Sequence, residues 1–262
     1  MTITKKMGER LVIQGSQMLK REKDTLFNIE HVGEDFIFND EVARVFDDMI
    51  DRSVPFYAEV IESAAQLLDR FLNEGELVCD LGCSTGSTLL QFSRILSHKQ
   101  LRFLGCDNSP AMLEEARQKA EMFGKGKQIE FRCSNITDFS EKNVDAVVLN
   151  YTLQFLRPLQ RMEFLQRVFN ALRPGGILIL SEKTILDDQR LNRDFIHIYH
   201  QFKKARGYSE LEIARKREAL ENVLIPFSRE ENLEMLHSCG FCSVTTFFQW
   251  FNFCSILAVK PK

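Results

Sequence analysis

Short apolar runs alternate with amphipathic stretches along most of the chain. This alternation predicts strand–helix–strand units and therefore a mostly parallel sheet covered by helices on both faces. Helices are expected between the runs, for example over 110–123 and 158–172, and the Arg-Pro-Gly-Gly sequence at 173–176 ends the latter. The predicted strands are Leu77–Leu81, Leu101–Cys106, Ile129–Cys133, Val144–Leu149 and Ile177–Ser181, followed by a C-terminal antiparallel hairpin formed by Val244–Gln249 and Ser255–Val259.

Two segments fall outside this alternation. Residues 39–72 carry apolar side chains at helical spacing, and Pro55 is expected to open a second helix through Tyr57 to Phe71. Because these helices precede the first strand, they predict an N-terminal helical cap. Residues 187–223 form a helical insert before the last two strands, with an apolar stripe of Leu191, Phe195, Ile198 and Phe202. Packing on the core or on a second subunit explains this stripe better than a substrate surface does.

The segment from Val78 to Thr88 joins an apolar strand to a helix through a turn of small residues. Gly82 and Gly86 permit unusual backbone angles and a close ligand approach, and the amides opening the next helix face the turn. The second strand ends in Asp107, at the position where an acidic side chain binds ribose hydroxyls. Together these features predict a nucleotide-binding cradle rather than a structural turn alone.

The spacing of the glycines separates two kinds of nucleotide site. A dinucleotide-binding dehydrogenase would show G-x-G-x-x-G, but the turn from Gly82 to Gly86 lacks the middle glycine that lets a pyrophosphate approach the backbone. The D-x-G-x-x-x-G form instead resembles the first motif of the class I S-adenosylmethionine (SAM)-dependent methyltransferases. It implies a Rossmann-like α/β fold.

Length and composition are consistent with one domain over 24–262, preceded by an extension over 1–23 with no clear periodicity. The chain has 262 residues, 44% of them hydrophobic. The formal charge of −3 and a pI near 6.0 show no global basic footprint, so no direct nucleic-acid binding is expected. No apolar run reaches membrane-spanning length and no signal-peptide core is evident. A cytoplasmic protein is predicted.

The seven cysteines are odd in number and scattered, as in a chain from a reducing compartment. Cys239 and Cys242 form a C-x-x-C, but no second pair or histidine cluster lies at metal-ligand spacing, so no metal is expected. Gly240 between them is expected to cap a helix. Cys83 in the cradle favours a small side chain beside a ligand over a nucleophile.

The insert also carries basic residues, among them Lys203, Arg215 and Arg217. Composition alone favours a solvated helical face, because glutamates lie at i to i+4 spacing from these bases. A resemblance to a known family changes this interpretation.

From about Asp24 to its end, the chain resembles the carboxy-S-adenosyl-L-methionine (carboxy-SAM) synthases, which supply the carboxymethyl donor for the wobble uridine of bacterial tRNA. The matching segments are 52–55 (RSVP) with Tyr57, 80–84 (DLGCS), 107–112 (DNSPAM), 149–150 (LN) with 152–156 (TLQFL), 181–183 (SEK), 207–213 (GYSELEI), and 216–217 (KR) with 220–223 (LENV). Several of these are absent from ordinary methyltransferases.

The resemblance implies which residues bind the cofactor and what each does. Asp107 would bind the ribose hydroxyls, the turn at Gly82 would approach the amino-acid end, and residue 135 would face the adenine amino group. The family commonly has Asp at this last position, so Asn135 would bind adenine without charge assistance. The implied cofactor-binding residues are Tyr57, Gly82, Cys83, Ser84, Asp107, Asn108, Asn135, Ile136, Asn150 and Arg217.

Arg217 matches the arginine that holds the extra carboxylate of the family's product and is the implied catalytic residue. A cation near a sulfonium is repelled by up to roughly 4 kcal/mol at ~4 Å, whereas a ligand carboxylate reverses the sign. Arginine also binds a carboxylate through two parallel hydrogen bonds. In the implied reaction prephenate loses carbon dioxide and water to give phenylpyruvate, and the activated methyl of SAM, as an ylide, captures the carbon dioxide.

The resemblance leaves several points open. Candidates for binding the prephenate dianion are Lys183, His200 and Lys203, and no general base can be named. A homodimer is expected, as is a downstream tRNA carboxymethyltransferase that uses the product. The alternatives are an ordinary SAM-dependent methyltransferase, which leaves Arg217 unexplained, and a non-catalytic nucleotide-binding subunit.

Overall fold

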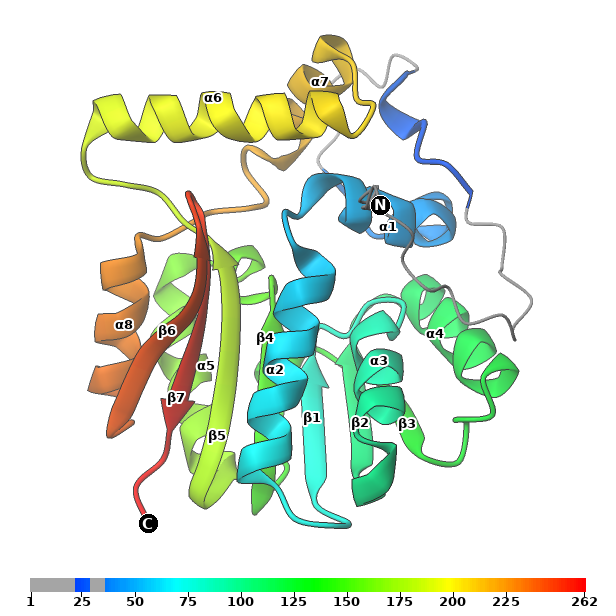
Figure 1. The fold of residues 1–262 in the computed structure, drawn as a ribbon, viewed down its shortest axis with the longest axis vertical. Helices are drawn as coiled ribbons and strands as arrows, with labels where there is room; N and C mark the ends of the chain where they lie inside the picture. Colours follow the sequence, from blue (N-terminus) through cyan, green and yellow to red (C-terminus); the bar gives the residue numbers. More distant parts are fainter. Residues whose placement is uncertain (1–21, 29–35) are drawn as a thin grey trace, which may run out of the picture.

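A computed structural model describes residues 22–28 and 36–262. The predicted N-terminal extension over 1–23 lies almost wholly outside the described residues. The described chain forms a central sheet with helices on both faces, and a group of helices lies across one end of the sheet (Figure 1). No helix in the described ranges combines the length and apolarity needed to cross a membrane.

The sheet has seven strands in the order β3-β2-β1-β4-β5-β7-β6. The first five are parallel, β7 runs antiparallel to β5, and β6 and β7 form the antiparallel hairpin expected from the sequence. The predicted strands are therefore confirmed, with shifts of no more than two residues at all ends but one. The prediction was wrong at the start of β5, which begins at Leu172 and includes the Arg-Pro-Gly-Gly sequence at 173–176, where its pairing with β4 shifts register. The strand bounds are β1 Leu77–Leu81, β2 Arg102–Asp107, β3 Ile129–Cys133, β4 Val144–Asn150, β5 Leu172–Lys183, β6 Ser243–Trp250 and β7 Phe253–Val259.

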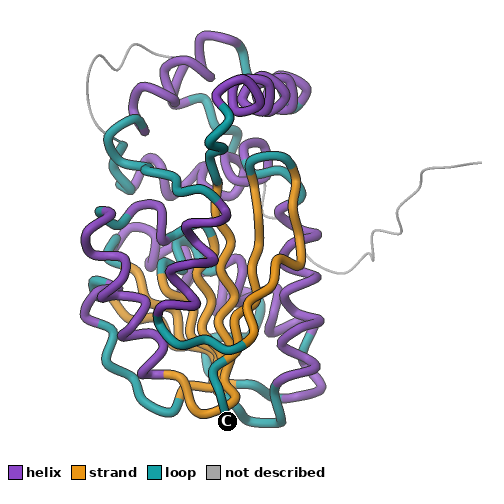
Figure 2. Tube along the Cα trace, turned by 90° about the vertical axis from the view of Figure 1, so that its left-hand side faces the viewer, coloured by secondary structure: helices purple, strands orange, loops and turns teal. Residues whose placement is uncertain are grey.

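Helices pack on both faces of the sheet, as the alternating pattern predicts (Figure 2). On one face α2 (Tyr57–Phe71), α3 (Ser87–Ile95) and α4 (Pro110–Met122) bury residues such as Leu68, Phe92 and Leu113 against the strands. On the other face α5 (Pro158–Ala171) and α8 (Arg229–Ser238) bury residues such as Phe164 and Leu236. Short 3₁₀ turns are η1 (Leu26–Asn28), η2 (Ser97–Lys99), η3 (Ile136–Asp138) and η4 (Leu153–Phe155).

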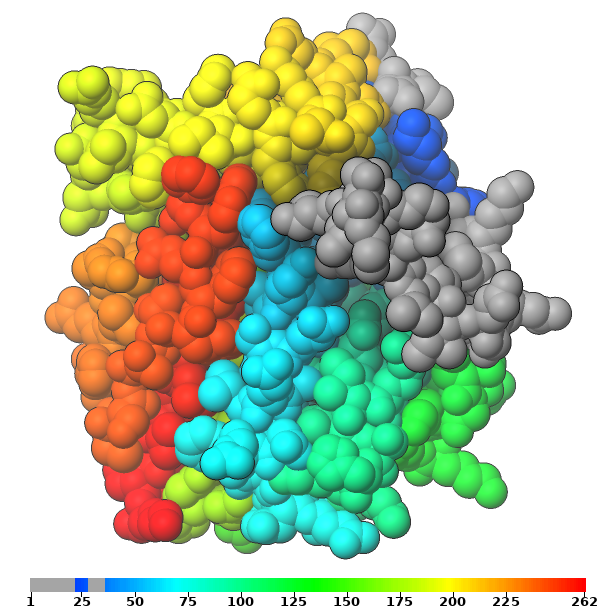
Figure 3. Space-filling model, in the orientation of Figure 1, coloured from blue at the N-terminus to red at the C-terminus, as the bar shows by residue number. Residues whose placement is uncertain are grey.

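Three further helices lie across the C-terminal ends of the parallel strands. They are α1 (Asp40–Ser53) and the two helices of the insert, α6 (Gln189–Ala205) and α7 (Glu210–Leu220). In the space-filling view the insert forms a continuous layer above the hairpin and α2 (Figure 3). The stripe predicted on α6 packs on the hairpin turn, where Phe202 meets Trp250 and Phe195 meets Phe251.

The two N-terminal helices occupy different places: α1 lies in the layer across the strand ends, and α2 lies on one face of the sheet. α1 packs its apolar side on α4 and on the segment before it, whereas α2 is buried against the sheet along its length. α2 begins at Tyr57 and not at Pro55, because Phe56 takes a left-handed conformation with φ of 56° and interrupts the helical path.

A buried polar cluster joins the insert to α1 and to the segment before it. Tyr208, between α6 and α7, donates a hydrogen bond to Asp24 at 2.6 Å and stacks against the Arg52 guanidinium at 3.8 Å. Arg52 donates to the carbonyls of Asp24 and Arg206 at 3.1 and 2.9 Å. Lys216 on α7 donates to Ser53 at 3.0 Å. We call Asp24, Arg52, Ser53, Tyr208 and Lys216 the latch.

Candidate active site

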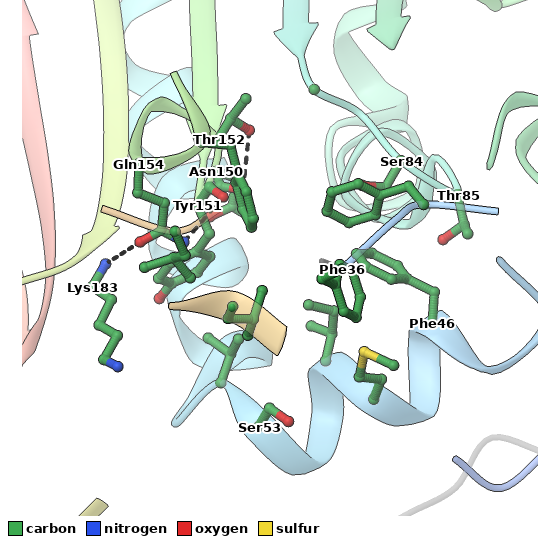
Figure 4. Close-up of a pocket in the computed structure, with 18 of the residues that line it drawn as sticks. Phe36, Phe46, Ser53, Ser84, Thr85, Asn150, Tyr151, Thr152, Gln154 and Lys183 are labelled. Carbon is green, nitrogen blue, oxygen red and sulfur yellow. Dashed lines mark hydrogen bonds between the residues drawn. The ribbon is translucent and has the colours of Figure 1, made fainter. Parts of the chain in front are cut away.

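A cavity of about 1050 Å³ lies between the C-terminal ends of the strands and the layer formed by α1, α6 and α7. It opens where the strand order reverses between β1 and β4, the position at which open α/β sheets bind ligands. Figure 4 shows two walls, with Ser84, Thr85, Phe36 and Phe46 facing Asn150, Tyr151, Gln154 and Lys183. Its volume is at the upper end of the roughly 300–1,000 Å³ typical of small-molecule sites.

The structure brings all the site residues expected from the sequence to this one cavity. Their roles toward a ligand stay predictions, but their convergence from eight separate parts of the chain is a property of the fold. The residues that line it are Tyr57, Gly82, Cys83, Ser84, Asp107, Asn108, Asn135, Ile136, Asn150 and Arg217, together with Lys183, His200 and Lys203.

The glycine turn after β1 requires its glycines for geometric reasons. Gly82 and Gly86 have φ of 82° and 70°, in the left-handed region. A Cβ on Gly82 would lie 2.3 Å from Cγ2 of Thr152, on the neighbouring strand end. The amides of Gly82 and Cys83 donate to the Cys106 carbonyl at 2.7 and 3.1 Å, which fixes the turn against β2. The turn is therefore rigid before any ligand enters.

Asp107 is held by the backbone on both sides. Its two carboxylate oxygens accept hydrogen bonds from the amides of Ser84 and Ser109, each at 2.9 Å. Burial raises the pKa of this carboxyl, and the amide hydrogen bonds act in the opposite direction. Each carboxylate oxygen has a second lone pair, so Asp107 retains the capacity to accept hydroxyl groups from a ligand.

Asp80 is a cavity residue that the sequence reasoning did not place in the site. It is 1% exposed, and its Oδ1 has no hydrogen-bond partner among the described residues. Burial and the nearby Asp107 raise its pKa to about 8. A cationic ligand group such as an ammonium would supply the missing partner and favour the ionised form. The signal in the sequence is the acidic residue that interrupts the apolar run of β1.

Tyr57 and Asn150 meet through Thr88, which the sequence analysis did not assign to the site. The hydroxyl oxygens of Tyr57 and Thr88 lie 3.0 Å apart, and the Asn150 amide donates to Thr88 at 3.4 Å. Thr88 is in the first turn of α3, directly after the glycine turn. The three side chains come from α2, α3 and β4, so this link closes the cradle across three elements.

Asn135 lines the cavity, but its side chain also has a local structural role. Its carboxamide oxygen accepts a hydrogen bond from the Thr137 amide at 3.1 Å and thereby caps η3. One lone pair of that oxygen remains for an adenine amine. Neighbouring Ile136 is buried and presents an apolar surface to the same part of the cavity.

Cys83 behaves as a small buried side chain. It is 5% exposed, and burial together with Asp80 and Asp107 raises the pKa of its thiol well above the ordinary value. The thiol therefore stays protonated at neutral pH, which agrees with the expectation that it is no nucleophile. All seven cysteines are free. Within residues 22–28 and 36–262, no cluster of three His, Cys, Asp or Glu residues is placed to hold a metal.

α1 closes the cavity from the side of the cradle. Asp47 accepts hydrogen bonds from Thr85 at 2.7 Å and Ser87 at 2.9 Å, both next to Gly86, and it pairs with Lys119 on α4. Burial acts to raise the pKa of Asp47, but Lys119 and the two hydroxyl groups outweigh it and lower the pKa. The cap is thus bonded directly to the turn that it covers.

The loop after β4 is held by a buried carboxyl group. Glu182 accepts a hydrogen bond from the Leu153 amide at 3.0 Å, and Gln154 accepts one from the Lys183 amide at 3.1 Å. Burial raises the pKa of Glu182 to about 8, although Arg161 lowers it in part. These bonds hold the loop that follows Asn150 in place beside the cradle.

The insert provides a further wall of the cavity, above the strand ends that carry the cradle. Arg217 is on the last turn of α7, and Lys203 and His200 project from α6 beside it. Burial and the charges of Lys203 and Arg217 lower the pKa of His200 to about 4. Ile196 and Tyr199 line the same wall and were missed from the sequence. The signal was the second helical face, with 196, 199, 200 and 203 at i, i+3, i+4 and i+7, beside the apolar stripe.

Comparison with known proteins first defines the class. Residues 78–176 match the model of a methyltransferase domain. An O-methyltransferase family protein from Burkholderia thailandensis has a TM-score of 0.61 at 20% identity, covering 87% of this chain and 64% of that one. Human N-acetylserotonin methyltransferase in complex with SAM has a TM-score of 0.59 at 17% identity, covering 85% and 57%. The chain therefore has the Rossmann-like class I methyltransferase fold, as expected.

Full-length relatives then define the family. The carboxy-S-adenosyl-L-methionine synthase of Desulfotalea psychrophila is 58% identical over 92% of this chain and 98% of its own length. That of Wolinella succinogenes is 45% identical over 92% of this chain and 99% of its own. The chain belongs to the carboxy-S-adenosyl-L-methionine synthases, a family of enzymes, and the resemblance noted in the sequence is confirmed.

Proposed function

We propose that this protein converts SAM and prephenate to carboxy-SAM, phenylpyruvate and water. One observation carries the proposal: Arg217 shares the cavity with the cradle, and no acidic side chain among the described residues pairs with it. A methyltransferase that binds only a sulfonium has no use for an uncompensated arginine at that place. A product with an additional carboxylate needs one, because the guanidinium binds a carboxylate with two parallel hydrogen bonds.

The proposed reaction balances without a metal or redox step. Cleavage of the bond between the prephenate ring and its carboxylate supplies the electron pair that makes the ring aromatic, and the ring hydroxyl leaves as hydroxide. The hydroxide takes a proton from the SAM methyl group to give water. The resulting ylide carbon forms a bond to the released carbon dioxide. Arg217 favours the negative charge that accumulates on the new carboxylate.

This chemistry needs a dry site, because water would reprotonate an ylide. The arrangement of α1, α6 and α7 over the strand ends supports such a role (Figure 1). The latch ties the insert to α1, and Asp47 ties α1 to the glycine turn. Both closing elements are thereby connected to the cradle that they cover.

In the cell, carboxy-SAM would be the carboxymethyl donor for 5-carboxymethoxyuridine at the tRNA wobble position, consumed by a tRNA carboxymethyltransferase. The synthase itself acts on small molecules in this scheme and has no need to bind RNA. We expect it to act in the cytoplasm, as a homodimer.

A mass spectrum of the small molecule released by denaturing the purified protein tests the proposal. We expect a mass above that of SAM by one carbon dioxide unit, and the same species when SAM and prephenate are incubated with ligand-free protein. Recovery of SAM or its demethylated product alone, with no carboxylated species after incubation, would contradict the proposal and favour an ordinary methyltransferase.

A further inference from the structure

The insert side of the cavity gathers positive charges that lack counterions. Lys203 on α6 is 6% exposed, and no hydrogen bond or ion pair to its ammonium occurs among the described residues. The Nζ of Lys183, at the end of β5, also has no hydrogen bond or ion pair among the described residues, and this side chain is partly buried. Burial and then the charges of Lys216, Lys183 and Arg217 lower the pKa of Lys203 to about 7, and no acidic group acts against them.

Lys216 differs from these two lysines because it is already bound within the protein. It donates to Ser53 at 3.0 Å and lies 4.0 Å from an oxygen of Asp24, so it belongs to the latch. Unpaired buried ammonium groups are costly, and where they line a cavity they mark a place for a ligand of opposite charge. Lys183 and Lys203 are therefore the groups available to an anion, in addition to Arg217.

Tyr199 fixes the position of both lysines. The Nζ atoms of Lys203 and Lys183 lie 4.8 and 5.3 Å from the centre of its ring. The ring cannot turn freely, because its hydroxyl donates to the Ser53 carbonyl at 2.9 Å and its ring centre lies 5.0 Å from that of Phe253 in a tilted pair. Figure 4 shows the Lys183 side chain extending beyond Gln154, with its terminal nitrogen free of any drawn hydrogen bond.

The proposed reaction explains why one cation is not enough. Its substrate carries two carboxylates, of which one is transferred and the other stays on the carbon skeleton. Arg217 is assigned to the transferred group, so the retained carboxylate needs a site of its own. A six-membered carbon ring also needs an apolar contact, and Ile196 and Tyr199 provide one on the same wall.

We propose that Lys183 and Lys203, held around the Tyr199 ring, form a second anion subsite that binds the retained carboxylate of a ring-bearing dicarboxylate substrate. This inference rests on the proposed function for the identity of that substrate. Tyr199 packs in the same apolar cluster as Tyr57, but no hydrogen bond or ion pair among the described residues joins the Lys183 or Lys203 ammonium to the cradle. We therefore expect the two lysines to set the affinity for the second substrate and to leave the affinity for SAM nearly unchanged.

The test uses Lys183→Met and Lys203→Met in the full-length protein, with Lys204→Met as the matched control. Lys204 is on the same helix but pairs with Glu210 and does not line the cavity. We expect KM for prephenate to rise about 10-fold or more in each cavity variant, the size of one lost charge-assisted hydrogen bond. The Kd for SAM, measured by calorimetry, should change less than about 2-fold, and Lys204→Met should match the wild type. Unchanged KM in both cavity variants overturns the subsite.

A second measurement separates the subsite from the proposed function. If wild-type protein makes no carboxylated product from prephenate, the proposed function fails, and SAM-loaded protein is titrated with phenylsuccinate and with 3-phenylpropionate, its monocarboxylate counterpart. Tighter binding of the dicarboxylate that is lost in Lys183→Met and Lys203→Met supports the subsite. Equal binding by wild type and both variants overturns it. Lys203→Met could lose SAM binding because it misfolds, and Lys203→Arg, which keeps the positive charge, is the variant for that case. Lys203→Arg must bind SAM and must still prefer the dicarboxylate. Failure of either overturns the subsite.

Discussion

The hydroxyl of Tyr208 donates a hydrogen bond to the carboxylate of Asp24 over 2.6 Å, joining the insert to a segment near the start of the described chain. Both side chains are buried, and the Arg52 guanidinium lies over the Tyr208 ring. The bond therefore connects the insert to the segment before α1 within the layer that closes the cavity.

Removal of this bond is expected to destabilise the protein. Tyr208→Phe leaves a buried carboxylate oxygen of Asp24 with one partner fewer, which costs about 1–3 kcal/mol of unfolding free energy. Urea denaturation measures the change. Tyr151→Phe is the matched control, because the buried Tyr151 hydroxyl has no partner among the described residues and its loss should cost nothing. Equal stability of Tyr208→Phe and wild type would show that the latch is not a stabilising connection.

Arg217 is expected to distinguish carboxylated from ordinary ligands. Arg217→Ala should lower the affinity for carboxy-SAM by about 10-fold or more, the loss of a charge-assisted pair, and leave the affinity for SAM within about 2-fold. Arg217→Lys should recover only part of the loss, since an ammonium lacks the bidentate geometry. Calorimetric titration with both ligands measures this, with exposed Arg193→Ala on α6 as control. A parallel loss of both ligands would contradict the assignment.

Asn135 offers a substitution that should improve binding. Asn135→Asp keeps the oxygen that caps η3 and adds a negative charge opposite the expected adenine amine. We expect SAM to bind up to about 5-fold more tightly, corresponding to about 1 kcal/mol. The exposed Asp138→Asn on the same 3₁₀ turn controls for a change in local charge. Weaker binding in Asn135→Asp would mean that the adenine amine does not face this side chain.

The raised pKa of Asp80 leads us to expect that SAM binding depends on pH. Its pKa in the ligand-free protein is raised to about 8, so below pH 8 it is mostly protonated, and a cationic ligand must displace that proton. Affinity should therefore rise with pH, by at most about 10-fold per unit, and level off above pH 8. Asp80→Asn should flatten the profile. The same raised pKa makes the carboxyl costly to folding as pH rises from 4 toward 8, so Asp80→Asn should also reduce the loss of stability over that range.

The sequence by itself determined the sheet and the cradle. The strands follow from apolar runs, and the turn between Gly82 and Gly86 follows from glycines whose backbone angles other residues avoid. Asp107 was predictable because it ends a strand, and parallel strands bring their carboxyl ends to one edge. These features depend on neighbours along the chain. The resemblance to a known family added Arg217, which composition alone assigned to a solvated face.

Only the tertiary structure decided which charges are compensated and which are free. Lys203, Lys204 and Lys216 are equivalent in a helical pattern, but one lacks a partner, one pairs with Glu210 and one joins the latch. The tertiary structure likewise decided that Thr88 joins Tyr57 to Asn150 and that Oδ1 of Asp80 has no hydrogen-bond partner among the described residues. Desolvation and pairing depend on residues that are distant in sequence and meet only when α1, the insert and the sheet pack together.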